Sequence, residues 1–292
     1  MELVSVYLIT QNRSKLLKRA IESVFEQSYP TIQLIVVDDA STDDTQELIA
    51  FFKQKYDFIY LKNEVISGAC FSRNRAIEVA NGYYVTGLDD DDYFHFDRVA
   101  ELVAAYDEKY AFVCSNTQEL MRNNDLIDRS FGFKAGEFGL DKLLHHNLVG
   151  NQVLTTKTKF VKAGGFDVNM PAFQDYDTWV RLLRNTPLAL KISARNYILE
   201  TNHGCARISL NSSAKFIGYK LFFNKNKDLM DRKQLQSMEL LGIKISGEQY
   251  GIYQLVKTIN NSNYKSAINL YLLRNLNWFK IFLDNRKKNK TK

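Results

Sequence analysis

The sequence is poor in cysteine and in proline. Its 292 residues include three cysteines, Cys70, Cys114 and Cys205, which lie far apart and form no C-x-x-C pair. This pattern argues against a disulfide framework or a cysteine zinc site and favours reduced thiols in a cytosolic protein. Only three prolines occur, so no stiff linker marks a domain boundary.

Segments that would span a membrane or direct secretion are also missing from the sequence. No uninterrupted apolar run approaches the ~20 residues that a transmembrane helix needs. The N-terminus leads directly into an apolar run at residues 3–9 with no basic region before it, so we expect a strand there and not a signal peptide. These features predict a cytoplasmic protein that is at most peripheral on the inner face of the membrane.

Charge is distributed unevenly along the chain. Lys and Arg number 39 against 33 acidic residues, which gives a net charge of +6. Ten basic and two acidic residues fall in 242–292, so this segment carries +8 and residues 1–241 carry −2. The body of the protein is therefore mildly acidic, and the C-terminal end carries the basic charge that would suit an anionic partner.

The first hundred residues alternate between strand and helix patterns. Short apolar runs predict four strands, at residues 4–9, 34–37, 58–61 and 83–88. Amphipathic spacing predicts three helices between them, at residues 15–27, 41–55 and 69–80. This order is typical of a mostly parallel α/β sheet with helices on both faces, in which ligands bind beyond the carboxyl ends of the strands.

The rest of the chain is less regular. We expect two strands at residues 112–115 and 117–121, followed by a turn at 122–125. Four shorter elements follow: a helix at 141–146, a strand at 153–157, a turn of helix at 159–163 and an amphipathic helix at 175–184. From residue 211 the pattern is helical to about residue 283.

Four aspartates, Asp89 to Asp92, directly follow the fourth predicted strand. Adjacent carboxylates repel one another unless cations or hydrogen-bond donors neutralise them. Mg²⁺ or Mn²⁺, bound by one or two carboxylates and by substrate phosphates, would do so. The alternative is a solvated acidic loop in which Asp92 caps a helix that begins near His95.

A second acidic pair, Asp38 and Asp39, follows the second predicted strand. One acid suffices to cap the next helix, so the other is available to accept hydrogen bonds from a nucleoside, as in other α/β nucleotide sites. Arg13 and Arg73 could balance the charge of a diphosphate. Arginines at the start of a helix also pair with nearby acids for structural reasons.

Together these motifs resemble inverting glycosyltransferase family 2, whose fold is GT-A. The resemblance runs nearly without gaps over residues 3–98 and rests on residues 10–13 (TQNR), 27–30 (QSYP), 36–43 (VVDDASTD), 68–74 (GACFSRN) and 88–92 (LDDDD). Residues 164–167 (GGFD) and 174–181 (QDYDTWVR) resemble the acceptor half of the same family.

The resemblance implies a domain organisation and a set of binding residues. It places a GT-A domain at residues 1–210, with a nucleotide-sugar half at 1–98 and an acceptor half at 99–210, before a helical region with a basic tail at 211–292. It implies that the donor is bound by Thr10, Arg13, Asp38, Asp39, Gly68, Arg73, Asp89 and Asp90. It also implies metal ligation by Asp91 and His203, although a lone histidine is as readily structural.

The catalytic residue that the resemblance implies is Asp175. The family pattern has Glu-Asp before this helix; Gln174 replaces the Glu here, and Asp175 keeps the place of the base. As general base, Asp175 would take the proton of an acceptor hydroxyl while that oxygen attacks the anomeric carbon with inversion. The alternative role for Asp175 is to cap the helix that follows it.

The same resemblance implies the substrates and the cofactor. The donor would be a nucleoside-diphosphate sugar, with UDP favoured, and Mn²⁺ or Mg²⁺ would stabilise the charge on the departing diphosphate. The acceptor would be a hydroxyl of a growing saccharide, such as a lipid-linked bacterial polysaccharide or lipooligosaccharide.

The basic C-terminal end has two interpretations. Apolar residues recur at helical intervals from Tyr264, with basic residues between them, and a basic run follows at 286–290. This end could contact an anionic membrane surface, or it could pack as a helix that carries a solvated tail. Since no known DNA- or RNA-binding motif accompanies the charges, we expect no nucleic-acid partner.

Two other function classes compete with the glycosyltransferase. A sugar-nucleotide-forming nucleotidyltransferase also has an α/β fold and acidic metal sites, but it would carry a Gly-rich basic loop where residues 10–13 stand. A non-enzymatic membrane-surface adaptor would not need acidic residues at the ends of its strands. The sequence therefore favours the glycosyltransferase.

Overall fold

The computed structural model describes residues 1–129, 133–150, 152–201 and 212–276. The chain divides into two compact units, which are described separately. The first unit contains the sheet and comprises Met1–Leu140, Leu148–Asn169 and Gln174–Cys205. The second unit is helical and comprises Asp141–Asn147, Met170–Phe173 and Ala206–Lys292.

A mixed sheet forms the centre of the first unit, with strand order β3-β2-β1-β4-β9-β6-β10-β5 and with β7 and β8 paired to β6 and β10. The strands are β1 (Val4–Thr10), β2 (Ile32–Asp38), β3 (Ile59–Lys62), β4 (Tyr84–Asp89), β5 (Tyr93–Phe94), β6 (Val113–Leu120), β7 (Leu126–Arg129), β8 (Gly136–Phe138), β9 (Leu154–Thr156) and β10 (Ala189–Glu200).

The helices of the first unit are α1 (Ser14–Phe25), α2 (Thr45–Lys53), α3 (Ala69–Val79), α4 (Arg98–Ala105), α6 (Lys157–Lys162) and α7 (Gln174–Asn185), together with the first residue of α5 (Leu140–Leu143). The predicted alternation of strand and helix over the first hundred residues is confirmed. Pairs β2–β3, β1–β2 and β1–β4 are all parallel, as buried apolar runs separated by helices predict.

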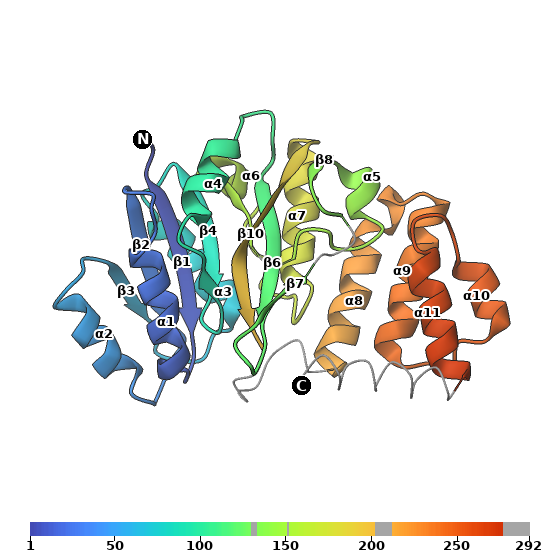
Figure 1. Ribbon diagram of the computed structural model, residues 1–292, viewed down its shortest axis with the longest axis horizontal. Coiled ribbons are helices and arrows are strands. Elements are labelled where there is room, and N and C mark those ends of the chain that lie inside the picture. The colour runs from blue at the N-terminus through green and yellow to red at the C-terminus, as the bar shows by residue number, and fades with distance from the viewer. Residues whose placement is uncertain (130–132, 151, 202–211, 277–292) are drawn as a thin grey trace. The chain divides into compact units, whose positions relative to one another are not determined.

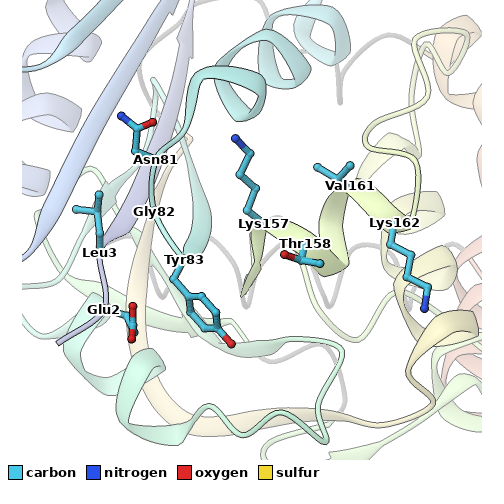
Figure 2. A pocket seen from close by; sticks show the side chains of 9 residues that line it. All are labelled: Glu2, Leu3, Asn81, Gly82, Tyr83, Lys157, Thr158, Val161 and Lys162. Atoms are coloured by element: carbon cyan, nitrogen blue, oxygen red, sulfur yellow. The ribbon is translucent and has the colours of Figure 1, made fainter.

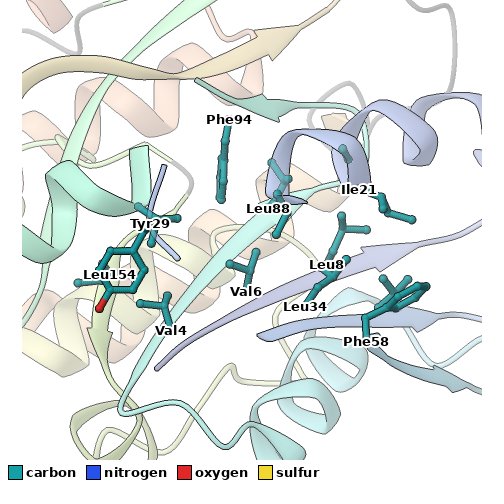
Figure 3. Packing of buried hydrophobic residues seen from close by; sticks show 14 of the residues in the cluster. Val4, Val6, Leu8, Ile21, Tyr29, Leu34, Phe58, Leu88, Phe94 and Leu154 are labelled. Carbon is teal, nitrogen blue, oxygen red and sulfur yellow. The ribbon is translucent and has the colours of Figure 1, made fainter. Parts of the chain in front are cut away.

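The apolar residues of β1 point alternately to the two faces of the sheet. Val4, Val6 and Leu8 are fully buried on one face, where they belong to the same cluster as Leu17 and Ile21 of α1 (Figure 3). Helix α3 packs on β1 and β2, and Figure 1 shows α1 in front of the sheet and α3 behind it. A sheet covered on both faces holds its strand ends in fixed positions.

The predicted pair of strands at 112–115 and 117–121 is wrong. Residues from Val113 to Leu120 form a single strand, β6, which continues through the polar Asn116 and then pairs antiparallel with β7 across the predicted turn. Asn116 is buried, and its Nδ2 donates to the carbonyl of Lys134 over 2.7 Å. Because the buried amide has a partner there, the polar residue does not end the strand.

Over the residues that the structure describes, the second unit consists of helices joined by short breaks, as its helical pattern predicts. They are the remainder of α5, then α8 (Ser212–Asn226), a short 3₁₀ helix (Lys227–Leu229), α9 (Arg232–Ser246), α10 (Ile252–Thr258) and α11 (Tyr264–Asn275). A capping box of Asp231 and Gln234 starts α9, and Gly247, with φ of 77°, ends it. Leu240, Tyr250 and Ala267 are buried in a small apolar cluster of this unit.

Over the described residues, none of the helices is both long enough and apolar enough to cross a membrane.

A glycine inside β4 makes room for two side chains that pack against the strand. A Cβ at Gly87 would lie 2.1 Å from Oε1 of Gln152 and 2.4 Å from Cε2 of Tyr7. We therefore predict that Gly87→Ala lowers the free energy of unfolding by about 1–3 kcal/mol, the usual cost of overpacking a core. Urea denaturation followed by circular dichroism measures this change.

Gly251→Ala is the matched control for this prediction. A Cβ there would meet only the end of the Gln254 side chain, at 3.3 Å. If Gly87→Ala unfolds at the same urea concentration as Gly251→Ala, the close approach at β4 does not limit stability.

Candidate active site

Polar residues at the ends of three neighbouring strands meet at one edge of the sheet. The parallel register places Thr10 of β1 beside Asp38 of β2, and Ile9 of β1 beside Asp89 of β4. The polar clusters that follow these strands therefore share the carboxyl edge of the sheet, where α/β proteins bind their ligands.

The acidic loop after β4 is held by a hydroxyl group and an arginine. Asp90 accepts one hydrogen bond from Thr10 Oγ1 and another from Arg13 Nη1, both over 2.8 Å. The Arg13 guanidinium also lies 3.5 Å from Oδ2 of Asp91. Asp90 is buried, and its burial raises its pKa to about 6, an effect that Arg13 opposes. Thr10 and Arg13 are thus direct partners of this loop.

Arg19 of α1, for which the sequence predicts no role, also supports the acidic loop. Its Nη2 donates to the backbone carbonyl of Asp91 over 3.1 Å, and its guanidinium lies 4.4 Å from the centre of the Tyr93 ring. It also forms an ion pair with Glu200 of β10. The guanidinium groups of Arg13 and Arg19 therefore offset part of the repulsion among the loop carboxylates.

Arg73 of α3 joins the acidic loop to the predicted base. Its Nη2 lies 2.8 Å from Oδ1 of Asp89, and its Nη1 lies 3.6 Å from Oδ1 of Asp175. The guanidinium is buried and lies 5.3 Å from the centre of the Phe166 ring. One cation therefore connects the end of β4 with the start of α7.

The Asp175 carboxyl has an unusual environment for an acid in the first turn of a helix. About a fifth of the side chain is exposed (19%), although its Oδ1 atom is buried. Burial raises its pKa to about 7; Arg73 opposes this rise, and Asp89 adds to it. A carboxyl group with a pKa near the pH of the cell can accept a proton efficiently and release it again.

Asp39 organises the loop that leads into α3. Its Oδ1 accepts hydrogen bonds from Asn63 Nδ2 over 2.7 Å and from the Ser67 amide over 2.8 Å, and its Oδ2 accepts one from the Gly68 amide over 2.8 Å. Gly68 has φ of 87°, which favours glycine at this position. Asp39 and Gly68, both predicted to bind the donor, are therefore in direct contact.

Asp38 is fully buried beneath this loop. Its carboxylate accepts hydrogen bonds from the Ser41 amide and from the Tyr60 hydroxyl, each over 2.8 Å. These contacts fix the turn between β2 and α2.

The GGFD motif at 164–167 is attached to α3 by Asn74. This side chain accepts a hydrogen bond from the Phe166 amide over 2.8 Å and donates one to the Phe166 carbonyl over 2.7 Å. A Cβ at Gly165 would lie 2.8 Å from Asn74 Oδ1, which explains the glycine. The two predicted halves are thus joined by a pair of hydrogen bonds next to Arg73.

Two buried residues that the sequence pattern does not predict, Gln152 and Tyr7, lie beneath Asp89. Gln152 Nε2 donates to Asp89 Oδ1 over 3.1 Å, and Tyr7 Oη donates to Gln152 Oε1 over 3.0 Å. No motif surrounds Gln152. The only signal was Gly87, since a glycine inside a strand often marks the close approach of other groups.

The acidic loop presents carboxylate oxygens that a divalent cation could bind. Among the described residues, no group of three or more His, Cys, Asp and Glu side chains could hold a metal ion. Mg²⁺ commonly uses only one or two carboxylates together with substrate phosphates, and the hard oxygens of Asp89 and Asp91 fit that kind of site. His203, the other predicted ligand, lies outside the described residues, as does Cys205.

A pocket of about 700 Å³ lies at the other edge of the sheet, near the first residues of β1 and β4 (Figure 2). Leu3, Tyr83 and Lys157 are among its lining residues. Lys157 Nζ donates to the carbonyls of Glu78 and Ala80, over 2.9 and 2.7 Å, and so caps the end of α3. None of the predicted site residues lines this pocket.

Comparison with known proteins gives relatives among glycosyltransferases. The chain is 33% identical over 251 residues to WcaA of Escherichia coli K12, a glycosyl transferase named for colanic acid biosynthesis; the match covers 83% of this chain and 88% of WcaA. It is 29% identical over 198 residues to WfaP of Escherichia coli, named UDP-Glc:alpha-D-GlcNAc-diphosphoundecaprenol beta-1,3-glucosyltransferase, with 64% and 75% of the two chains covered.

A solved structure with a similar fold is that of S. aureus TarS residues 1–349 in complex with UDP-GlcNAc. The TM-score is 0.68 at 18% sequence identity, and the match covers 93% of this chain and 81% of TarS. This likeness confirms the predicted GT-A fold.

The model of the family "Glycosyl transferase family 2" matches residues 5–167, which is more than half of the chain. This match includes the strand-end clusters, Arg73 and the Asn74 contact with Phe166. It decides among the three function classes that the sequence left in competition. The chain belongs to glycosyl transferase family 2 and is a glycosyltransferase.

Proposed function

We propose that this glycosyltransferase transfers a sugar, with inversion and with the help of a divalent cation, from a nucleoside-diphosphate sugar to a hydroxyl of a saccharide. The observation that carries the proposal is the position of Arg73 between Asp89 and Asp175. It brings a carboxylate of the expected donor site and a carboxyl suited to proton transfer to one buried cation.

In the proposed mechanism Asp175 is the general base. Its Oδ1 is buried beside Arg73, and the exposed part of the carboxylate, within a side chain that is 19% exposed, would accept the proton of an acceptor hydroxyl. As the proton leaves, the hydroxyl oxygen attacks the anomeric carbon on the side opposite the nucleoside diphosphate, and the configuration inverts. Arg73 holds the carboxylate and stabilises its ionised form.

For the donor we propose UDP-sugar binding at the carboxyl edge of β1, β2 and β4. Asp39 and the loop at Gly68 would contact the nucleoside and the diphosphate, with Thr10, Arg13, Asp38 and Asp90 supporting them. The name of the relative WfaP, which states a UDP-glucose donor, supports the choice of UDP. Asp89 and Asp91 would hold Mg²⁺ or Mn²⁺, which when bound stabilises the charge of the leaving diphosphate.

For the acceptor we propose a growing, lipid-linked bacterial saccharide at the inner face of the membrane. The names of the relatives support this: one refers to colanic acid biosynthesis and another to a diphosphoundecaprenol-linked sugar. The basic tail would then contact anionic lipid; it lies in residues 277–292, outside the described residues.

Substitution of Asp175 tests the proposed general base. Asp175→Asn should lower kcat by about 100-fold or more, because general base catalysis typically contributes that much, and UDP affinity should stay close to that of the wild type. Asp44→Asn is the control, since Asp44 is an exposed acid at the start of α2. Initial transfer rates and calorimetric titration with UDP measure both effects. Wild-type kcat in Asp175→Asn would contradict the assignment.

The second prediction concerns pH. Because Asp175 must be ionised to accept a proton and its pKa is about 7, kcat/KM for the acceptor should fall about tenfold per pH unit below that value. Arg73 lowers the pKa of Asp175, so Arg73→Gln should move this acidic limb to higher pH. A limb that stays in place in Arg73→Gln would show that another group controls the profile.

The third prediction concerns the cation. A chelator should abolish transfer, and added Mn²⁺ or Mg²⁺ should restore it, because the diphosphate leaves with its charge neutralised. Asp91→Asn should need about tenfold more metal for half-maximal rate, since one carboxylate ligand is lost. Asp125→Asn, at the exposed turn before β7, is the control. Full activity in the presence of the chelator would contradict the proposed metal dependence.

A further inference from the structure

The carboxylate of Asp89 is oriented by two donors that bind the same oxygen. Arg73 Nη2 approaches Oδ1 to 2.8 Å from α3, and Gln152 Nε2 approaches it to 3.1 Å from the segment before β9. The backbone amide of Asp89 donates to the Tyr197 hydroxyl over 3.2 Å. Two contacts therefore restrict rotation of the carboxylate, and a third holds the backbone of the same residue.

The orientation of the Gln152 amide is itself determined by Tyr7. An amide side chain can present either its NH₂ or its oxygen to a neighbour. Because the Tyr7 hydroxyl donates to Gln152 Oε1 over 3.0 Å, the NH₂ end is directed to Asp89. Burial raises the pKa of Tyr7 well above its ordinary value, so the phenol keeps the proton that it donates.

Close packing holds this pair in place. Gln152 is 4% exposed and Tyr7 is 3% exposed, so water does not compete effectively for their hydrogen bonds. The Tyr7 ring meets the Phe166 ring edge-on at 6.2 Å. The missing side chain at Gly87 leaves the space that both residues occupy.

We propose that Tyr7 and Gln152 are positioning residues of the transferase: Tyr7 orients the Gln152 amide, and Gln152 orients the Asp89 carboxylate for the nucleotide of the donor. The inference rests on the proposed role of Asp89 in donor binding. Neither residue touches the substrate or takes part in proton transfer. Their effect is transmitted through one side chain to the next.

The test compares Tyr7→Phe, Gln152→Met and the double variant, all of which keep the size and apolar contacts of the originals. The affinity for UDP with Mn²⁺ is measured by calorimetry, and KM and kcat are measured with a UDP-sugar. Gln152→Met should weaken UDP binding and raise the donor KM by about tenfold, the value of a lost hydrogen bond to a charged group, with a smaller change in kcat. Tyr7→Phe should weaken binding by about threefold or more.

The double variant tests the order of the relay. If Tyr7 acts only through Gln152, then adding Tyr7→Phe to Gln152→Met changes UDP affinity no further. Independent, multiplying effects would overturn the relay. Wild-type UDP affinity in Gln152→Met would overturn the role of Gln152.

Tyr29→Phe is the matched control, because it also removes a buried tyrosine hydroxyl, one that donates to the Glu2 carbonyl over 2.6 Å. An equal loss of UDP affinity in this variant would assign the effect to general loosening of the fold and overturn the proposal. If the wild type binds UDP but transfers no sugar, the proposed function fails, and the UDP affinities still decide the inference. If the wild type transfers sugar and Gln152→Met is unchanged, the inference alone fails.

Discussion

The candidate active site depends on the two ion pairs that the buried guanidinium of Arg73 forms. This guanidinium binds Asp89 at the end of β4 and lies beside Asp175 at the start of α7, so removal of either acid changes the environment of the other. Breaking a buried ion pair by removing one partner typically costs about 3–5 kcal/mol. The proposed donor site and the proposed base therefore share one cation.

Arginines also determine the shape of the acidic loop. Arg13 binds Asp90, and Arg19 binds the carbonyl of Asp91. The repulsion among four adjacent carboxylates is thus partly relieved by cations of the protein itself. A loop held in this way has less conformational entropy to lose if the proposed cation and diphosphate bind there. The net charge of the whole chain says little about this local balance.

Sequence alone predicted the features that depend on local pattern. The strands β1, β2 and β4 and the helices between them follow from apolar periodicity, and parallel strands necessarily bring the groups after Thr10, Asp38 and Asp89 to one edge. The side-chain pairings could not be predicted in the same way. Arg13 and Asp90 are 77 positions apart, and Gln152 lies 63 positions from Asp89, so their contacts depend on how distant segments pack. The predicted break between two strands at Asn116 was wrong for a related reason, because the carbonyl that accepts a hydrogen bond from this side chain belongs to Lys134, 18 positions away.

The paired hydrogen bonds between Asn74 and Phe166 have a mechanical consequence. They fasten the chain just upstream of α7 directly to α3, so the position of Asp175 does not depend on the path that the chain takes between them. A change in the length of a connecting loop would therefore leave this attachment in place, and the proposed base would keep its position beside Arg73 and the proposed donor site.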